Sequence, residues 1–290
     1  MATAPARTYS LKRKLSSLDG SGVSATVLPP RKKSAISVTP RAKPKPVQMH
    51  LAFNQNPLKT CKICALTYTR GVPDDEALHK THCTRVQKGL EWIREEDKGI
   101  TIIEPAAMLS GGTEGRILAV RADASGKLGN KLGSIMHTID LALSAPALSQ
   151  ASLKATKAYL FLCKPKGASR EHVAGCLLAQ RITSAFAVLE THNEPDVTST
   201  AVDSVQYDPT PLPTPLGIPR IFVACAYRRK GVASALFSAA ARTAVHGCTL
   251  SSVEGHIAFS QPTGDGRIFM NNMHITRVYE EDSGEPSNPS

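Results

Sequence analysis

Long apolar runs are missing from this chain of 290 residues. A membrane-spanning helix needs about 20 consecutive apolar residues, and no run approaches that length. The first residues, MATAPARTYSLKRK, also lack the apolar stretch of a secretory signal. We therefore expect neither a membrane protein nor a secreted one. Apolar residues make up 41% of the chain, an ordinary composition for a soluble protein with one core and a smaller module.

Acidic residues are scarce at the N-terminus, although not elsewhere. Residues 1–50 hold ten Lys or Arg residues against one acid, Asp19, which gives this segment a net charge of +9. The rest of the chain carries only +2 of the total charge of +11. A basic body would indicate a broad nucleic-acid surface, whereas a basic tail indicates nuclear import or loose contact with polyanions.

Residues 1–56 are expected to form a disordered basic tail, because six prolines and many small polar residues leave little apolar surface to bury. Two basic clusters, KRK at 12–14 and RKK at 31–33, have the spacing of a bipartite nuclear localisation signal. The prediction is a nuclear protein. The alternative is charge that only keeps the tail soluble.

Gln48 and Leu51 match the start of a ligand for the replication sliding clamp, which continues with two aromatic residues. Asn54 and Gln55 occupy those aromatic positions, and Phe53 stands one place early. A weak clamp-binding motif near Gln48 is one interpretation. The alternatives are a chance match and a short strand that leads into the next module.

The seven cysteines are an odd number, which argues against a disulfide framework. Three of them fall in the segment CKICALTYTRGVPDDEALHKTHC, where Cys61 and Cys64 form a C-x-x-C pair. His79 and Cys83 share one face of an expected helix. These four residues predict tetrahedral zinc in a ββα module over residues 57–92, with His82 as the rival fourth ligand. The alternative is a surface helix with incidental His and Cys.

The expected helix of this module begins with three acids, Asp74, Asp75 and Glu76, which would repel DNA phosphates. Fingers that read DNA also usually occur in repeats, and the sequence holds one. Zinc is therefore expected to fold the module rather than to support DNA reading.

From residue 99 onward, strand-like and helix-like segments alternate, which predicts an α/β (α+β) body over residues 99–279. Strands are expected at 100–104, 116–122, 157–164, 173–189 and 220–225, and a helix at 127–143. Residues 190–219 contain six prolines, five acids and no Lys or Arg, so an acidic loop is expected there. Residues 280–290 are expected to form a disordered C-terminus.

The strand at 220–225 is followed by a basic turn, residues 228–231, and an Ala-rich helix. Backbone N–H groups at the positive end of that helix would bind a pyrophosphate, and Gly231 would let it approach closely. The Arg-x-x-Gly-x-Ala pattern at 228–233 matches the signature of the GNAT acetyltransferases. The alternative is a plain amphipathic helix with a basic start.

Three segments, GIPRIFV (217–223), YRRKGVA (227–233) and IAFSQPTGDGRIF (257–269), resemble the Eco1/ESCO family of sister-chromatid cohesion acetyltransferases. The upstream zinc module is the other hallmark of that family, and the resemblance covers roughly residues 57–275. It implies a GNAT-type fold with a zinc finger, acetyl-CoA as cosubstrate and structural zinc. It also implies a nuclear, chromatin-associated enzyme that acetylates lysines on the ATPase head of cohesin's SMC subunit.

The resemblance further implies site residues. Asp265 matches the acid of the family's Pro-Thr-x-Asp-Gly turn and would act as proton acceptor, with a pKa that burial should raise. The implied cofactor contacts are Ile221, Phe222, Val223, Arg229, Lys230, Gly231, Val232, Ala233, Ser234, Arg267, Ile268 and Phe269.

Three positions depart from the family's pattern. Cys83 stands where the family usually has His, Pro219 where some members have Ser, and Ser238 or a neighbouring Ala where relatives carry an acid. The last two keep a second hypothesis open, a zinc-finger chromatin adaptor with a non-catalytic, CoA-binding domain. A sequence-specific DNA-binding protein is the third hypothesis, and the acidic start of the finger helix argues against it.

Overall fold

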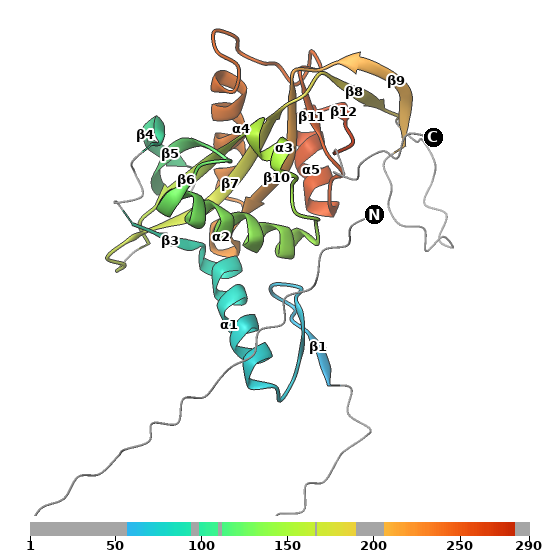
Figure 1. Ribbon diagram of the computed structural model, residues 1–290. Helices are drawn as coiled ribbons and strands as arrows, with labels where there is room; N and C mark the ends of the chain where they lie inside the picture. Colours follow the sequence, from blue (N-terminus) through green and yellow to red (C-terminus); the bar gives the residue numbers. More distant parts are fainter. Residues whose placement is uncertain (1–56, 94–98, 110–111, 166, 190–205, 282–290) are drawn as a thin grey trace, which may run out of the picture. The chain divides into compact units, whose positions relative to one another are not determined.

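The computed structural model describes residues 57–93, 99–109, 112–165, 167–189 and 206–281. The predicted basic tail and the Gln48 motif lie outside them. The described chain forms a small ββα unit and a larger body built on one mixed sheet, as Figure 1 shows. The predicted mixed α/β fold class is thus confirmed. None of the described helices is long and apolar enough to cross a membrane.

The ββα unit consists of a short hairpin and one helix. Strands β1 (Leu58–Thr60) and β2 (Thr67–Thr69) pair antiparallel, and helix α1 (Pro73–Lys88) follows. Two of the three acids in the first turn of α1 tie the helix to the hairpin. Asp75 Oδ2 accepts from the Thr69 amide at 3.3 Å, and Glu76 Oε1 accepts from the Gly71 amide at 2.9 Å. These acids therefore satisfy backbone donors of the hairpin and of the turn that precedes the helix.

Gly89 ends α1 in a backbone conformation, φ 80° and ψ 179°, that essentially only glycine adopts. The chain then enters strand β3 (Leu90–Trp92), which pairs with strand β7 of the body. A Cβ at Gly89 would meet the Val173 carbonyl oxygen at 2.2 Å. The connection between the ββα unit and the body therefore depends on this residue having no side chain.

The body's sheet runs in the order β4-β5-β6-β7-β10-β11-β12-β8-β9, and β3 lies against β7. All its pairs are antiparallel except β10 with β11 and β11 with β12. The strands not yet bounded are β4 (Thr101–Leu109), β5 (Thr113–Arg121), β6 (Thr156–Cys163), β7 (Glu171–Arg181), β8 (Ser184–Val188), β9 (Tyr207–Pro213), β10 (Leu216–Val223), β11 (Ile257–Phe259) and β12 (Arg277–Val278).

Strands β10 and β11 separate part-way along their length. Their Cα register runs from Leu216 opposite Ile257 to Ile218 opposite Phe259, and β10 then continues alone on that side to Val223. On its other side β10 stays paired with β7 up to Val223. Residues 219–223 of β10 therefore leave one row of backbone groups without a strand partner, and the sheet opens there.

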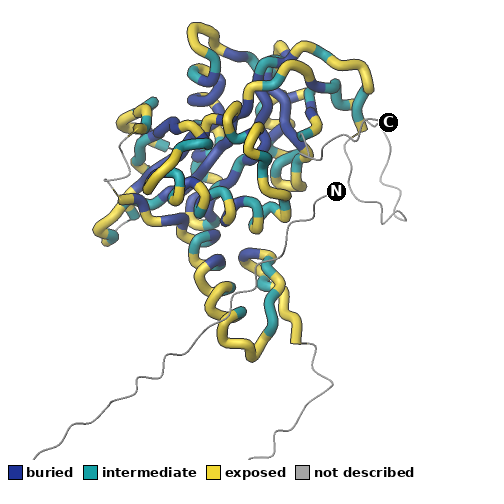
Figure 2. Tube along the Cα trace, in the orientation of Figure 1, coloured by how far each residue is buried: buried dark blue, intermediate teal, exposed yellow. Residues whose placement is uncertain are grey.

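The helices of the body are α2 (Gly126–Leu143), α3 (Gln150–Lys154), α4 (Val232–Thr243) and α5 (Gly264–Asn272), with a short 3-10 helix, η2 (Cys225–Tyr227), after β10. Helix α4 contacts β4, β6, β7 and β10. Most of the buried hydrophobic residues form one cluster that follows the central strands, as Figure 2 shows, and Ala185, Ala258 and Tyr279 form a second, small cluster. Cys64 and Val86 of the ββα unit belong to the larger cluster.

Three expectations need correction. The predicted acidic loop 190–219 is wrong in its second half, because Tyr207–Pro213 forms β9 and β10 begins at Leu216. An edge strand accepts the three prolines of β9, since their missing donors can face outward. The expected strand at 173–189 is two strands, β7 and β8. The predicted disordered end begins too early, because Glu280 and Glu281 accept hydrogen bonds from Tyr207 and Arg220.

Candidate active site and metal centre

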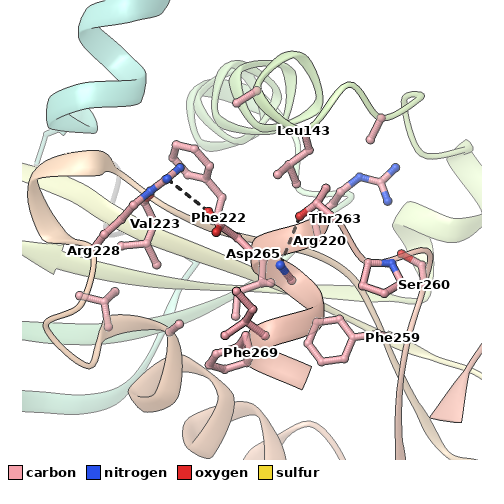
Figure 3. A pocket seen from close by; sticks show the side chains of 18 of the residues that line it. Leu143, Arg220, Phe222, Val223, Arg228, Phe259, Ser260, Thr263, Asp265 and Phe269 are labelled. Atoms are coloured by element: carbon pink, nitrogen blue, oxygen red, sulfur yellow. Dashed lines mark hydrogen bonds and ion pairs between the residues drawn. The ribbon is translucent and has the colours of Figure 1, made fainter. Parts of the chain in front are cut away.

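A cleft of about 550 Å³ opens where β10 and β11 separate. Four parts of the chain line it: the C-terminal half of β10, the start of α4, the start of α5, and the end of α2 with its following turn. Figure 3 shows this cleft, with Leu143 from α2 on one side and Phe269 of α5 on the other. Of the predicted cofactor contacts, all but Lys230 and Arg267 line it, and Asp265 does too.

The basic turn before α4 presents backbone donors to the cleft. Arg229 (φ 59°) and Gly231 (φ 84°) both adopt the left-handed conformation, and no side chain caps the start of α4. Successive amides in such a turn, together with the positive end of a helix, make an anion site. Lys230 instead lies over the Tyr227 ring, 5.4 Å from its centroid. The turn thus has the geometry to hold a pyrophosphate.

Asp265 lies in the first turn of α5, so the segment expected to be a Pro-Thr-x-Asp-Gly turn is helical from Gly264 onward. Thr263 caps the helix, with its Oγ1 accepting from the Gly266 amide at 3.3 Å. Burial of Asp265 is not found, because its side chain is 75% exposed. Its Oδ2 lies 3.5 Å from Arg228 Nη1, also on the cleft. The carboxylate is therefore accessible to an entering cation.

Cysteine is absent from the described residues that line the cleft. Burial raises the pKa of Cys163 and raises that of Cys176 to about 12, so both thiols stay neutral. Cys225 is partly buried in the core cluster and does not line the cleft. A direct transfer without a covalent enzyme intermediate suits this arrangement.

Pro219 and Ser238, two positions that depart from the family's pattern, lie in different parts of the structure. Pro219 lines the cleft, whereas Ser238 is exposed on α4 and does not line it. At Pro219 the backbone carbonyl is engaged instead of a hydroxyl, since it accepts from Ser260 Oγ at 3.0 Å.

The sequence interpretation missed several lining residues. They are Ala142, Leu143, Ser144, Ala145, Arg220, Tyr227, Phe259, Ser260, Gln261, Pro262, Thr263, Gly266 and Asn272. The end of α2 gave no local signal of a site. Arg220 did, because a lone charged residue inside the apolar strand GIPRIFV is costly to bury unless it has partners.

The ββα unit brings together Cys61, Cys64, His79 and Cys83. One ligand atom of each lies within 4.8 Å of all the others, and Cys61 Sγ is 3.9 Å from Cys83 Sγ. Two thiolates on tetrahedral zinc lie roughly 3.8 Å apart at Zn–S distances of about 2.3 Å. His79 Nε2 is buried without a hydrogen-bond partner among the described residues. The donor set and the unsatisfied nitrogen fit zinc.

The thiols in this group have unequal proton affinities. The Cys64 and Ile63 amides lower the pKa of Cys61 to about 6, while burial raises the pKa of Cys64 and raises that of Cys83 to about 12. His82, the rival ligand, is buried outside the group. Its pKa is lowered by burial and then by His137 of α2, which places it against the body.

Two segments of the chain match models of known protein families. A family described as "ESCO1/2 acetyl-transferase" matches residues 213–279, and one described as "zinc-finger of acetyl-transferase ESCO" matches residues 48–85. In structure, the body resembles the xEco2 acetyltransferase domain bound to a CoA conjugate. That match has a TM-score of 0.52 and 26% identity, and it covers 64% of this chain and 100% of that chain.

Individual relatives give the same result. The chain is similar to N-acetyltransferase ESCO2 of Mus musculus, with 30% identity over 212 residues, which are 72% of this chain and 32% of that protein. It is also similar to N-acetyltransferase ECO1 of Yarrowia lipolytica, with 24% identity over 263 residues, 88% of this chain and 82% of that protein. The chain spans about a third of the mammalian ESCO2 proteins it matches. The chain thus resembles the Eco1/ESCO N-acetyltransferases in both its zinc-finger segment and its acetyltransferase segment.

Proposed function

We propose that this protein transfers an acetyl group from acetyl-CoA to a lysine side chain of another protein. The observation that carries the proposal is the cleft, in which an amide-rich basic turn at the start of α4 adjoins the unpaired edge of β10. A CoA conjugate bound to the related xEco2 domain supports it. Lys230 and Arg267 do not line the cleft, so they would contact the cosubstrate from outside it.

The turn 228–231 and residues 232–234 of α4 would hold the pyrophosphate of the cosubstrate, and residues 221–223 of β10 would hold the arm that carries the acetyl group. Backbone N–H groups on that strand edge would polarise the thioester carbonyl. Phe269 packs edge-on against Phe237 and Phe259 at centroid distances of 6.0 and 6.3 Å. This aromatic cluster would exclude water from one side of the reacting groups.

The lysine amine must lose a proton, because only the neutral amine attacks a thioester and its free pKa is about 10.4. Asp265 would accept that proton directly or through water. The new bond joins the amine nitrogen to the acetyl carbon, and the carbon–sulfur bond breaks. The nitrogen loses its second proton as the amide forms, and the CoA thiolate takes up one proton. Because Asp265 is exposed in the free chain, a bound protein substrate would have to supply the burial that makes it a better base.

The ββα unit would bind zinc through Cys61, Cys64, His79 and Cys83. The metal would hold the hairpin against α1 in a unit too small to bury a core alone. No chemical step is assigned to it.

The family suggests a particular substrate and setting. We propose cohesin's SMC ATPase head as the substrate and the nucleus, on chromatin, as the location. A sliding-clamp contact near Gln48 belongs to the same proposal as its weakest part. The test is mass spectrometry of a purified cohesin head after incubation with the chain and acetyl-CoA. New acetyl-lysine would support the proposal. A chain that binds acetyl-CoA but leaves the cohesin head without acetyl-lysine would contradict it.

The competing function is a chromatin adaptor that binds CoA without turnover. It is favoured by Pro219, which brings no hydroxyl to the cleft wall, and by the exposed Ser238. Calorimetric binding of acetyl-CoA, combined with no acetyl transfer to any lysine peptide, would select this function.

A further inference from the structure

Arg220 is a charged side chain buried in the wall of the cleft. It lies on β10, is only 5% exposed, and is flanked by the buried Ile218 and Phe222. A guanidinium in such a place is costly unless its donors are satisfied and its charge is balanced. Its contacts therefore indicate what the residue is for.

Four groups accept from this guanidinium. Nε donates to Asp140 Oδ1 at 3.3 Å, Nη1 donates to the Pro219 carbonyl at 2.8 Å and to Glu281 Oε1, and Nη2 donates to the Pro146 carbonyl at 2.8 Å. These acceptors come from the last turn of α2, from β10, from the segment after β12 and from the connection after α2. One side chain thus joins three parts of the chain that are distant in sequence: the end of α2 with its connection, β10, and the segment after β12.

The α2 connection is the segment that needs this support. Residues 142–145 line the cleft opposite α5, and Ser144 takes the left-handed conformation (φ 52°), which is strained for a residue with a side chain. Arg220 holds Asp140 immediately before this segment and Pro146 immediately after it. The guanidinium therefore fixes both ends of one cleft wall.

Both walls have backbone hydrogen bonds, such as the Ala145 amide to the Asp140 carbonyl at 2.9 Å in the α2 connection and the Ala235 amide to the Gly231 carbonyl at 2.9 Å at the start of α4. The α2 connection differs because Arg220 also holds the residues at its two ends. The hydrogen bonds of Arg220 go to Asp140, Pro146, Pro219 and Glu281, and none of these residues belongs to the turn 228–231 of the cofactor wall. Loss of the guanidinium should therefore loosen one wall of the cleft and leave the other in place.

The charges around Arg220 also favour a positively charged substrate side chain. Asp140 and Glu281 bring two negative charges against one positive charge, which leaves this buried group with a net charge of −1 behind the 142–145 wall. A negative group in a partly buried site attracts a cation such as a lysine ammonium more strongly than it would in water.

We propose that Arg220 is a positioning residue for the acceptor side of the cleft, which holds residues 142–145 and, with Asp140 and Glu281, sets the affinity for a cationic lysine substrate. This inference rests on the proposed acetyl transfer. It assigns Arg220 no contact with the reacting atoms.

The experiment compares Arg220→Lys with the full-length wild-type chain and with Arg116→Lys as matched control. Arg116 makes a similar, half-buried ion pair with Glu171 at 2.7 Å, but it lies on β5, away from the cleft lining. The measurements are the KM for a lysine peptide, kcat, and the calorimetric affinities for CoA and for the peptide with CoA present.

Arg220→Lys is expected to raise the peptide KM by about tenfold or more, since lysine cannot serve all four acceptors, while CoA affinity stays within about twofold. Arg116→Lys is expected to change neither binding constant beyond about twofold. Equal weakening of peptide and CoA binding, or no weakening of either, would overturn the proposal.

Glu281→Gln tests the proposal if the arginine variant does not fold. It keeps a hydrogen-bond acceptor near Arg220 and removes only the negative charge. A rise of about threefold or more in the peptide KM, or in its dissociation constant, is expected. An unchanged peptide affinity would contradict the charge argument.

A wild-type chain that binds CoA and peptide but transfers no acetyl would end the proposed function alone. The peptide affinity of Arg220→Lys would then still decide this inference. A wild-type chain that binds CoA but no lysine peptide would end both.

Discussion

Arg228 and Asp265 face each other across the mouth of the cleft, with Nη1 and Oδ2 3.5 Å apart (Figure 3). Arg228 follows η2 and Asp265 opens α5, so the pair joins the cofactor side of the cleft to the side of the expected proton acceptor. Both side chains are largely exposed, at 49% and 75%, so water and salt weaken their attraction. An entering lysine could therefore replace Arg228 beside the carboxylate at little cost.

Asp265→Asn tests the carboxylate. The variant keeps the side-chain shape and removes the base, so turnover should fall by about 10²–10⁴-fold while acetyl-CoA affinity stays unchanged. Raising the pH should restore part of the rate, because more substrate lysine is then neutral. Asp74→Asn, an exposed acid of the finger helix, is the control. If turnover falls by less than about threefold and its pH profile is unchanged, Asp265 is not the proton acceptor and has only a structural role at the start of α5.

Gly231→Asp tests the pyrophosphate site. The change adds a side chain at φ 84° and a negative charge at the start of α4, and both oppose an anion there. Affinity for acetyl-CoA should fall by about tenfold or more, which is about 1.4 kcal/mol. Gly247→Asp is matched in backbone, at φ 73° with open space around it, and lies beyond the other end of α4. Equal affinities of the two variants by calorimetry would place the cofactor elsewhere.

Metal content distinguishes the zinc ligands. Cys61→Ser, His79→Ala and Cys83→Ser should each lose stoichiometric zinc, because three ligands hold a structural zinc ion poorly. His82→Ala should keep it, since His82 lies outside the ligand group. The measurement is zinc per chain by atomic emission after dialysis. Retained zinc in Cys83→Ser together with lost zinc in His82→Ala would reverse the assignment.

Gly89→Ala tests how rigidly the finger helix joins the body. Its Cβ would meet the Val173 carbonyl at 2.2 Å in a backbone region reserved for glycine, so the free energy of unfolding should fall by about 2–4 kcal/mol. Gly71→Ala, at a similar φ of 85° with nothing within 4 Å, should cost only about 1 kcal/mol. Denaturant unfolding monitored at Trp92 measures both. Equal losses would mean that the contact with Val173 can relax.

A chain that begins at residue 56 should keep its turnover on a lysine peptide, because residues between 142 and 272 line the described cleft. The same chain should lose nuclear import, since both basic clusters lie in the removed part. Loss of most peptide turnover on truncation would show that the removed segment takes part in catalysis.

Local chemistry made part of this protein readable from its sequence. Cys61-x-x-Cys64 and the His79/Cys83 pair specify ligand spacing within one turn and one helix. The basic turn before α4 combines a strand, a glycine and a helix start in about ten consecutive residues. Such features depend on neighbours along the chain, so a linear pattern is enough to predict them.

Tertiary contacts decided the rest. The cleft exists because β10 and β11 part after Ile218, and strand pairing between distant segments leaves no mark in either strand alone. The exposure of Asp265 and the contacts of Arg220 with Asp140 and Glu281, 80 and 61 residues away, were likewise settled by packing. The sequence by itself determined which chemical groups the protein carries, and the fold determined which of them share a wall, because burial and distance depend on all the segments that surround a side chain.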